Sequence, residues 1–379
     1  MKFVFTALLI CAVSAFGEIS YQDLFVAGKG GYASYRIPAI IAAPDGSLLA
    51  FCEGRRDGRG DAGKIDMLLK RSTDGGGTWS EQTVVWADGE NTCGNPCPVV
   101  DAATGRIILF STWNLGADHE KEIIAGTSKN TRRVFYLTSD DNGVTWSQPV
   151  EVTAQTKQSS WGWYATGPGI GIQLQHGANK GRLVIPANHS YNYEGSILGA
   201  HVIYSDDGGK SWNISEPVFP GQNESQVVEL VDGTLMLNSR NHLNRGTRAI
   251  AFSADGGKSW PNPSSKSDLI EPRCQASIIR YAPNQVTNEN IILFSNPNST
   301  DKRIGMTVKL SYDEGKSWPI ARMLYSGPSA YSCLVALPDG RIGCFYEAGV
   351  SSSYEKLVFA AFTLEWLTGI KNQSQESGL

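Results

Sequence analysis

Carboxylate, hydroxyl and tryptophan side chains recur in one eight-residue pattern, Ser-x-Asp-x-Gly-x-Ser/Thr-Trp. The five copies span residues 72–79, 139–146, 205–212, 253–260 and 311–318. Their aspartates could act as catalytic acids or as calcium ligands. They could instead accept hydrogen bonds from backbone N–H groups in a hairpin turn, where the glycine supplies a positive φ. Because an identical site would be repeated in every unit, the pattern favours architecture, with each tryptophan buried beneath its turn.

A second candidate for chemistry is the cysteine pair in Cys93-Gly-Asn-Pro-Cys97. Its spacing matches no metal-ligand pattern and no histidine is close in sequence, so we expect no metal site there. Apart from Cys11, the chain has six cysteines, at positions 52, 93, 97, 274, 333 and 344. We predict buried thiols or a disulfide bridge for them.

Short strand-like runs surround the boxes and must position any functional side chains. Examples are residues 37–41, 106–110, 182–185 and 290–294, and no long amphipathic helix stands out. The box tryptophans recur every 48 to 67 residues. Such a repeat, built from several short strands, predicts blades stacked around an axis. Five boxes plus a final unit without one, residues 329–367, predict an all-β fold, a six-bladed β-propeller.

This order of motifs resembles the sialidase (neuraminidase) family. The resemblance is carried by Tyr35-Arg-Ile-Pro38 with the five boxes behind it, and it covers essentially the whole chain after residue 17. It implies a glycoside hydrolase that releases terminal α-linked sialic acid with retention, through a tyrosyl-enzyme intermediate. It implies no metal and no organic cofactor. The expected partners are sialylated glycans, glycoproteins or glycolipids.

The resemblance also implies three arginines that bind the substrate carboxylate, and the matching positions are Arg36, Arg240 and Arg303. The choice is chemically sound, because guanidinium forks match carboxylate geometry and stay charged at any relevant pH. Clustered cations need a counter-charge. Glu347, in the run Cys344-Phe-Tyr-Glu347, matches the family glutamate that supports the first arginine.

By the same resemblance the nucleophile is Tyr331 and its general base is Glu224, with Glu229 as a nearby alternative. A tyrosine has a physical reason here. The anomeric carbon of sialic acid already bears a carboxylate, which would repel an anionic Asp or Glu nucleophile. A neutral phenol activated by an adjacent carboxylate avoids this repulsion.

The expected acid/base is Asp61, in the glycine-flanked loop Arg59-Gly-Asp-Ala-Gly63. Such a loop can hold a carboxyl group over the glycosidic oxygen, where it protonates the leaving group and then activates water. Asp57 and Asp66 are close competitors, because a small shift in the alignment would exchange them. Asp66 falls in an apparent strand, which favours a structural role.

Further binding residues follow from the same match. Arg55 corresponds to a family arginine on the C4 hydroxyl side of the sugar, although Arg56 is adjacent. Asn95 stands where relatives often have aspartate, a change that would weaken pairing with Arg55. Gln275 is expected to reach the glycerol or N-acetyl side. Aromatic residues in 161–164 could stack on a neighbouring sugar or pack within a blade.

The bulk composition restricts the classes of partner. The chain has 379 residues, 41% of them hydrophobic and 18% charged, with a formal net charge of −4. This balance argues against nucleic acid or an anionic membrane surface as a partner. It does not exclude an acidic substrate, because binding depends on local charges.

Residues 1–17 have the features of a signal peptide. Lys2 precedes a short apolar run, and small residues follow it. The run is too short to span a bilayer, and we expect no integral membrane segment after its cleavage. We therefore predict a secreted or periplasmic protein with a propeller over residues 18–367 and a polar tail over residues 368–379.

Two alternatives use the same residues. A trans-sialidase, acting between or within molecules, would resolve the intermediate with a sugar hydroxyl in place of water. A non-hydrolytic sialic-acid-binding propeller would keep the arginines alone. The presence of Tyr331, Glu224 and Asp61 argues against this second alternative.

Overall fold

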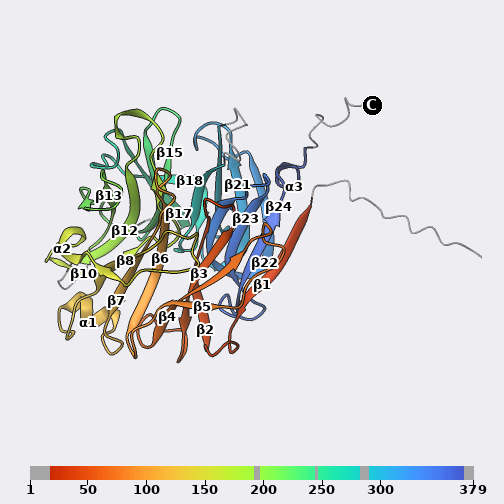
Figure 1. The fold of residues 1–379 in the computed structure, drawn as a ribbon. Helices are drawn as coiled ribbons and strands as arrows, with labels where there is room; N and C mark the ends of the chain where they lie inside the picture. Colours follow the sequence, from red (N-terminus) through yellow and green to blue (C-terminus); the bar gives the residue numbers. More distant parts are fainter. Residues whose placement is uncertain (1–17, 192–196, 244–245, 282–289, 371–379) are drawn as a thin grey trace, which may run out of the picture.

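The computed structural model describes residues 18–191, 197–243, 246–281 and 290–370, which form β-strands almost throughout (Figure 1). The predicted all-β class is confirmed. The expected signal peptide, residues 1–17, and the tail residues 371–379 lie outside the described residues. Among the residues that are described, no helix has the length and apolar character needed to cross a membrane.

The strands are joined into four sheets, of which the largest has eight strands in the order β2-β3-β4-β6-β7-β8-β9, with β5 paired to β4. Its strands are β2 (Ser34–Ala42), β3 (Leu48–Arg55), β4 (Ile65–Ser72), β5 (Thr83–Trp86), β6 (Thr92–Val100), β7 (Ile107–Asn114), β8 (Arg133–Ser139) and β9 (Val150–Glu151). Strands β4 and β6 meet in a single parallel pair, Ile65 with Thr92. The sheet therefore consists of two antiparallel groups of four strands.

The middle of the chain forms two smaller sheets. The first has the order β10-β12-β13-β14, with β11 paired to β12, and the second has the order β15-β16-β17-β18. The strands are β10 (Trp161–Thr166), β11 (Ile172–Gln173), β12 (Leu183–Tyr191), β13 (Leu198–Ser205), β14 (Asn213–Ile214), β15 (Gln222–Glu229), β16 (Leu235–Asn241), β17 (Gly246–Ser253) and β18 (Ser264–Glu271).

The last sheet joins the two ends of the chain in the order β1-β24-β23-β22-β21-β20-β19. Its strands are β1 (Ile19–Val26), β19 (Ser277–Tyr281), β20 (Ile291–Pro297), β21 (Ile304–Ser311), β22 (Ile320–Ala336), β23 (Ile342–Ala348) and β24 (Lys356–Phe362). The long strand β22 pairs first with β21 and then with β23. Strand β1, red in Figure 1, pairs along the blue β24, so the first and last strands close the fold together.

The five repeated boxes form turns that satisfy their own polar groups. In the first, Asp74 accepts hydrogen bonds from Thr78 N at 2.8 Å and Thr78 Oγ1 at 2.7 Å, and Ser72 Oγ accepts from Gly76 N at 2.9 Å. The hydrogen bonds from Thr78 lower the pKa of Asp74 to about 2. The tryptophan of this box packs edge-on against Phe359 of β24, with ring centroids 5.2 Å apart. The architectural interpretation therefore accounts for the whole motif.

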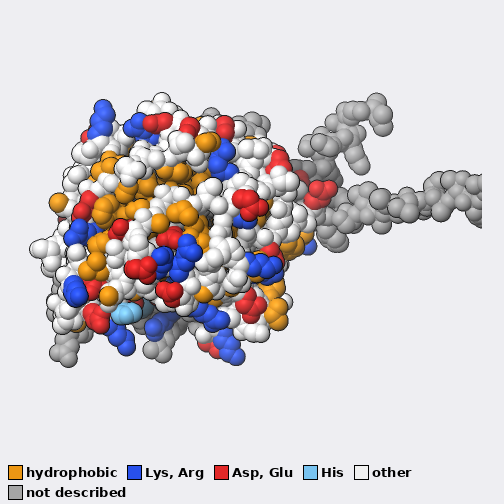
Figure 2. Space-filling view, turned by 60° about the horizontal axis from the view of Figure 1, so that its bottom comes forward, with side chains coloured by type: hydrophobic (Ala, Val, Ile, Leu, Met, Phe, Trp, Pro, Cys, Tyr) orange, Lys and Arg blue, Asp and Glu red, His pale blue; other side chains and the backbone are white. Residues whose placement is uncertain are grey.

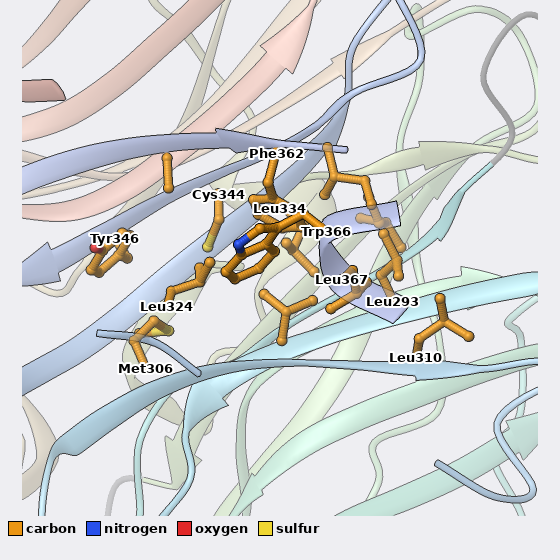
Figure 3. Packing of buried hydrophobic residues seen from close by; sticks show 14 of the residues in the cluster. Leu293, Met306, Leu310, Leu324, Leu334, Cys344, Tyr346, Phe362, Trp366 and Leu367 are labelled. Atoms are coloured by element: carbon orange, nitrogen blue, oxygen red, sulfur yellow. The ribbon is translucent and has the colours of Figure 1, made fainter. Parts of the chain in front are cut away.

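Short helices occupy only a small part of the described fold: α1 (Glu120–Ala125), α2 (Thr153–Thr156), α3 (Leu364–Thr368) and a 3₁₀ turn at Gly177–Asn179. Helix α3 begins where Thr363 Oγ1 accepts a hydrogen bond from Trp366 N at 3.1 Å, and it ends at Gly369. Trp366 and Leu367 are buried against Leu334 and Phe362 (Figure 3). The expected tail therefore starts inside a packed helix, because Thr368 belongs to α3. The six cysteines after residue 17 are buried free thiols, as one of the two predictions had it.

Two buried histidines, His189 in β12 and His201 in β13, lie in the sheet β10-β12-β13-β14, in contact with the aromatic segment 161–164. His189 stacks on Trp161 with ring centroids 3.6 Å apart, and its Nδ1 lies 3.0 Å from His201 Nδ1. Tyr164 Oη donates to a backbone carbonyl, so it accepts from His201 Nε2 at 2.8 Å. Burial lowers the pKa of His189 to about 3 and that of His201 well below its ordinary value. Both imidazoles are therefore neutral in the folded protein.

This pair predicts a loss of stability in mild acid. The unfolded histidines bind protons below a pKa of about 6.5, whereas the folded ones stay neutral to about pH 3. The two neutral histidines therefore cause no loss of stability well above pH 6.5. Below that pH the free energy of unfolding falls, by up to about 1.4 kcal/mol per pH unit for each histidine. Urea unfolding at several pH values should show a shallower slope for His189→Gln than for the wild type. The exposed His176→Gln is the control, and equal slopes in all three proteins would contradict the interpretation.

Candidate active site

Residues that are far apart in sequence meet in one cavity of about 320 Å³, at the small end of the range for small-molecule sites. It is lined by eight of the ten predicted site residues: Arg36, Arg55, Asp61, Asn95, Glu224, Arg240, Arg303 and Tyr331. None of the five box aspartates lines it. Of the two remaining residues, Glu347 lies directly behind the cavity wall and Gln275 lies deeper.

Irregular strand pairing orients the side chains that reach this cavity. The register shifts between Arg36 and Ala39 in β2, between Gly94 and Cys97 in β6, and between Trp161 and Tyr164 in β10. It shifts again beside Glu224 in β15 and Tyr331 in β22. Bulges of this kind redirect a side chain without moving the strand. In each of these five strands, a residue that lines the cavity thus lies at a bulge.

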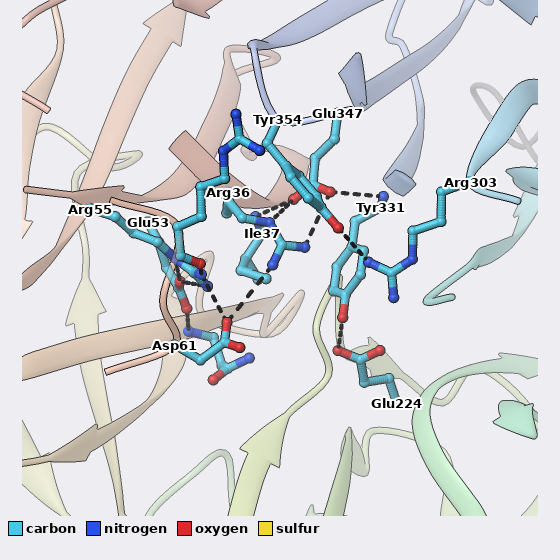
Figure 4. A network of polar contacts seen from close by, with 12 residues as sticks. Arg36, Ile37, Glu53, Arg55, Asp61, Glu224, Arg303, Tyr331, Glu347 and Tyr354 are labelled. Carbon is cyan, nitrogen blue, oxygen red and sulfur yellow. Dashed lines mark hydrogen bonds and ion pairs between the residues drawn. The ribbon is translucent and has the colours of Figure 1, made fainter. Parts of the chain in front are cut away.

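The phenol of Tyr331 is hydrogen-bonded to a carboxylate and an arginine. Tyr331 Oη donates to Glu224 Oε1 at 2.5 Å (Figure 4). Arg240 Nη1 donates to Glu224 Oε2 at 2.9 Å and lies 3.4 Å from Tyr331 Oη. Burial, followed by the Glu224 charge, raises the pKa of Tyr331 well above its ordinary value, against the effect of the nearby arginines. The phenol is therefore neutral and has a proton acceptor in contact.

Glu347 links Arg36 to the strand that carries Tyr331. Its fully buried carboxylate accepts from Arg36 Nε at 3.0 Å and Nη2 at 3.3 Å. It also accepts from the backbone N–H groups of Ile37 at 3.1 Å and Tyr331 at 3.2 Å. Ile37 has a φ of 62°, which is strained for a β-branched residue. The hydrogen bond to Glu347 therefore helps to hold a backbone conformation that aims Arg36 into the cavity.

The three predicted arginines surround the Tyr331 ring. The Cζ atoms of Arg36 and Arg303 lie 4.9 and 5.6 Å from its centroid. Arg303 donates to Tyr354 Oη at 2.8 Å and has no carboxylate partner among the described residues. One guanidinium group thus remains without a counter-ion, as a site for an anionic ligand requires. Charges of both signs are intermixed with hydrophobic side chains on the face shown in Figure 2.

Asp61 lies on the opposite side of the Arg36 guanidinium from Glu224 (Figure 4). Its Oδ1 is 2.8 Å from Arg55 Nη1 and 3.8 Å from Arg36 Nη1, and its side chain is 54% exposed. Partial burial would raise the pKa of Asp61, but Arg55 and then Arg36 outweigh that effect and lower it. The competing aspartates do not line the cavity, and Asp66 is buried with Tyr32 and Arg56.

The structure shows no pairing of Asn95 with Arg55, in keeping with the weakened contact that was expected. Arg55 binds Glu53 at 2.6 Å as well as Asp61, whereas Asn95 Oδ1 accepts from the buried Arg132 and, at 3.1 Å, from Thr112. Because arginine can only donate, the atom facing it is the amide oxygen. The Nδ2 group of Asn95 is therefore free to donate into the cavity, where an aspartate would present an acceptor.

Gln275 does not contact the cavity, and its predicted role at the sugar is wrong in this structure. It is buried, and its amide donates to Pro168 O at 3.1 Å and Ser332 O at 3.0 Å. Its oxygen accepts from Ser332 N at 2.9 Å, so it fixes the backbone next to Tyr331. Glu229, the alternative base, accepts from Gln175 N at 2.6 Å and His176 N at 3.0 Å and is also structural.

Several cavity residues have no specific signal in the sequence. These are Glu53, Glu120, Arg132, Trp163 and Tyr354. Trp161 and Tyr164 are buried in the core, as one of the two predictions for the aromatic segment had it, whereas Trp163 lines the cavity and covers the Arg132 guanidinium at 3.9 Å. Buried arginines beside a tryptophan are recognisable only once the strands are placed. Among the described residues, no group of three or more His, Cys, Asp or Glu side chains could hold a metal ion.

Comparison with known proteins places this geometry in context. Residues 46–344 match the family model described as a BNR repeat-like domain. The chain is 38% identical over 371 residues to a protein named sialidase from Micromonospora viridifaciens, covering 93% of this chain and 55% of the relative. It is 34% identical to a sialidase from Bacteroides fragilis, covering 86% of this chain and 62% of that protein. The chain therefore spans less than two thirds of these two curated relatives.

A solved structure titled Hadza microbial sialidase Hz136 is also similar. Its TM-score is 0.83 at 33% sequence identity, and the match covers 92% of this chain and 69% of that one. The similarity thus extends over most of the chain.

Loss of the Glu347 charge should destabilise the fold. Glu347→Gln leaves one amide oxygen to accept from four donors. It also removes the negative charge that is paired with the buried Arg36, and the loss of one partner of a buried ion pair typically costs about 3–5 kcal/mol. Urea unfolding should show a decrease in the free energy of unfolding of this order. The exposed Glu81→Gln is the matched control and should change it by less than about 0.5 kcal/mol. Equal stability of the two variants would show that Glu347 does not organise the site.

Proposed function

The chain belongs to the sialidase family, and from this premise we propose that it is an exo-α-sialidase, which hydrolyses terminal α-linked sialic acids of glycoconjugates with retention. The observation that carries the proposal is the hydrogen bond of 2.5 Å between Tyr331 and Glu224 inside a group of three arginines. A nucleophile in contact with its base, beside cations that lack a full set of counter-ions, fits a substrate that is itself a carboxylate.

In the proposed first step, Arg36, Arg240 and Arg303 bind the C1 carboxylate and set the anomeric carbon beside Tyr331 Oη. Glu224 takes the phenolic proton as the oxygen bonds to the anomeric carbon. The bond to the leaving group breaks, and Asp61 gives its proton to the departing glycosidic oxygen. The result is a tyrosyl-linked sugar and a free alcohol.

The second step reverses these proton transfers. Asp61, now a carboxylate, takes a proton from water as the water oxygen attacks the anomeric carbon. The tyrosine oxygen leaves and recovers its proton from Glu224. Two displacements at one carbon give net retention. Attack by a sugar hydroxyl in place of water would give transfer, and NMR analysis of the products distinguishes the two outcomes.

Substrate binding should also prepare Asp61 as an acid. In the free protein, Arg55 and Arg36 lower its pKa. When the substrate carboxylate binds Arg36, it neutralises part of this positive charge and excludes water from the carboxyl group. Both effects favour the protonated form of Asp61, which is the form that the first step needs.

We propose the six-bladed β-propeller of residues 18–367 as the architecture of this enzyme. The two halves of the eight-stranded sheet, the two central sheets and the two halves of the seven-stranded sheet supply six antiparallel groups. The export signal in residues 1–17 and a secreted or periplasmic location remain part of the proposal, since glycans on cell surfaces are the substrates that such an enzyme would meet.

Tyr331→Phe tests the mechanism directly. Removal of the nucleophilic oxygen should lower kcat on a fluorogenic sialoside by at least about 10³-fold, since single nucleophile deletions have effects of this size or larger. Tyr136→Phe alters a half-buried tyrosine outside the cavity and should retain full activity. Equal turnover by Tyr331→Phe and the wild type would contradict the proposed mechanism. Sialoside binding by a wild type that releases no sugar would favour the non-hydrolytic alternative.

Asp61→Asn tests whether Asp61 donates the proton that the leaving group receives. General acid catalysis contributes about 10²–10⁴-fold, and a poor leaving group needs it most. We expect a loss in this range on 3′-sialyllactose and a much smaller loss on an aryl sialoside, whose phenolate leaves readily. Asp57→Asn is the control and should behave as the wild type does. Equal losses on the two substrates would assign another role to Asp61.

A further inference from the structure

A half-buried lysine stands behind one wall of the catalytic cavity. Lys157 directly follows α2, and its Nζ atom donates three hydrogen bonds, each of 2.6 Å, to Thr131 Oγ1, Arg132 O and Gly162 O. These three partners use every donor of an ammonium group. Lys157 itself does not line the cavity, so its contacts act on the residues that do.

One of these hydrogen bonds supports the bulge that carries Trp163. Gly162 and Trp163 lie in the register shift of β10, where a strand ladder leaves backbone groups unpaired. Lys157 binds the carbonyl of Gly162, and Ser190 Oγ accepts from Trp163 N at 3.0 Å. Both polar groups of the peptide between Gly162 and Trp163 are therefore satisfied, while Trp163 lines the cavity.

Another of the three hydrogen bonds fixes the residue on which Trp163 stacks. Lys157 Nζ binds the carbonyl of Arg132, whose guanidinium lies 3.9 Å from the centroid of the Trp163 ring. One ammonium group thus joins the peptide that precedes Trp163 to the peptide that follows Arg132. The two members of the stack are held together from behind as well as by their own contact.

Stability alone does not account for a cation in this place. Within the described part of the chain, none of the hydrogen bonds that Lys157 and Arg132 donate goes to a carboxylate. Burial, followed by the charge of Arg132, lowers the pKa of Lys157 to about 7. A charge that is buried beside a like charge is unfavourable. The arrangement therefore points to a role for the wall in front of it.

This wall is separate from the groups that bind the carboxylate. Arg132 and Trp163 line the same cavity as Tyr331, yet among the described residues they form no hydrogen bond with Tyr331, Glu224 or the three predicted arginines. The cavity measures only about 320 Å³. A sugar whose carboxylate lies at those arginines thus meets Arg132 and Trp163 with another part of its surface.

We propose that Lys157 is a positioning residue of this site: its ammonium group holds Trp163 against Arg132 and so sets the wall that meets the sugar away from its carboxylate. This role rests on the proposed function and adds to it a residue that touches neither the substrate nor the reacting atoms. Because the wall is remote from the reacting carbon, it contributes equally to binding of the substrate and of the transition state, and its loss changes KM rather than kcat.

Lys157→Met in the full chain tests this role. KM for 4-methylumbelliferyl sialoside should rise about tenfold, the effect of losing a cation–aromatic contact of ordinary strength. The value of kcat should stay within about twofold of the wild type. Lys210→Met, on an exposed turn of the third box, is the matched control and should change neither value. A fall in kcat at unchanged KM would overturn the proposal.

A double-mutant cycle separates positioning from a general effect on the fold. In the Trp163→Ala background, which lacks the ring, adding Lys157→Met should change KM by less than about twofold, because the lysine acts through that ring. An equal rise in both backgrounds, or no rise in either, would overturn the proposal. If Lys157→Met shows no cooperative thermal unfolding, Lys157→Gln replaces it with the same expectations, because its shorter side chain cannot reach all three acceptors.

Failure of the proposed function would be seen separately. If the wild type releases no sugar, that function fails, and calorimetric titration with N-acetylneuraminic acid repeats the cycle with Kd in place of KM. A rise in Kd for Lys157→Met that disappears in the Trp163→Ala background supports the positioning role. Additive changes in Kd, or the absence of binding by the wild type, overturn it.

Discussion

The site depends on one buried carboxylate. Glu347 has no exposed side-chain surface, yet it accepts four hydrogen bonds, from two atoms of Arg36 and from the backbones of Ile37 and Tyr331. A buried cation is costly unless it is paired and hydrogen-bonded. Glu347 meets this requirement from behind the cavity, so the open side of Arg36 still faces a ligand. The same carboxylate accepts from the backbone of Tyr331, so one group holds both the Arg36 guanidinium and the strand that carries the Tyr331 phenol.

Regular strands could not supply this arrangement by themselves. In an even strand, neighbouring side chains point to opposite faces, and only alternate residues would reach the cavity. The bulges in β2, β6, β10, β15 and β22 break this alternation at the cavity and leave the rest of each strand paired. Two of these bulges contain the positive φ values of Ile37 and Asn95. The local strain is offset by the hydrogen bonds that Glu347 and Glu53 accept from these two residues.

Much of this was predictable from the sequence, for a physical reason. The box turns use local hydrogen bonds between residues a few positions apart, so their pattern can be recognised in the sequence. The all-β class was predicted from this pattern. The arginines, Tyr331 and Glu224 were found through the family motif. The buried position of Gln275 was not predicted, because its contacts with Pro168 and Ser332 join segments that are far apart in sequence. Arg132 has no local signal, since its partners lie about 20 to 40 residues away.

In the proposed mechanism, the two reactive carboxylates owe their different roles to their surroundings. Glu224 is buried and bound to both Tyr331 and Arg240, so the proton it can most readily exchange is that of the phenol. Asp61 is half exposed at the edge of the cavity, where the mechanism needs it to reach a glycosidic oxygen and later a water molecule. If these environments were exchanged, the buried carboxylate could not reach the leaving group and the exposed one could not activate the tyrosine. Position within the cavity, rather than residue type, therefore assigns base and acid.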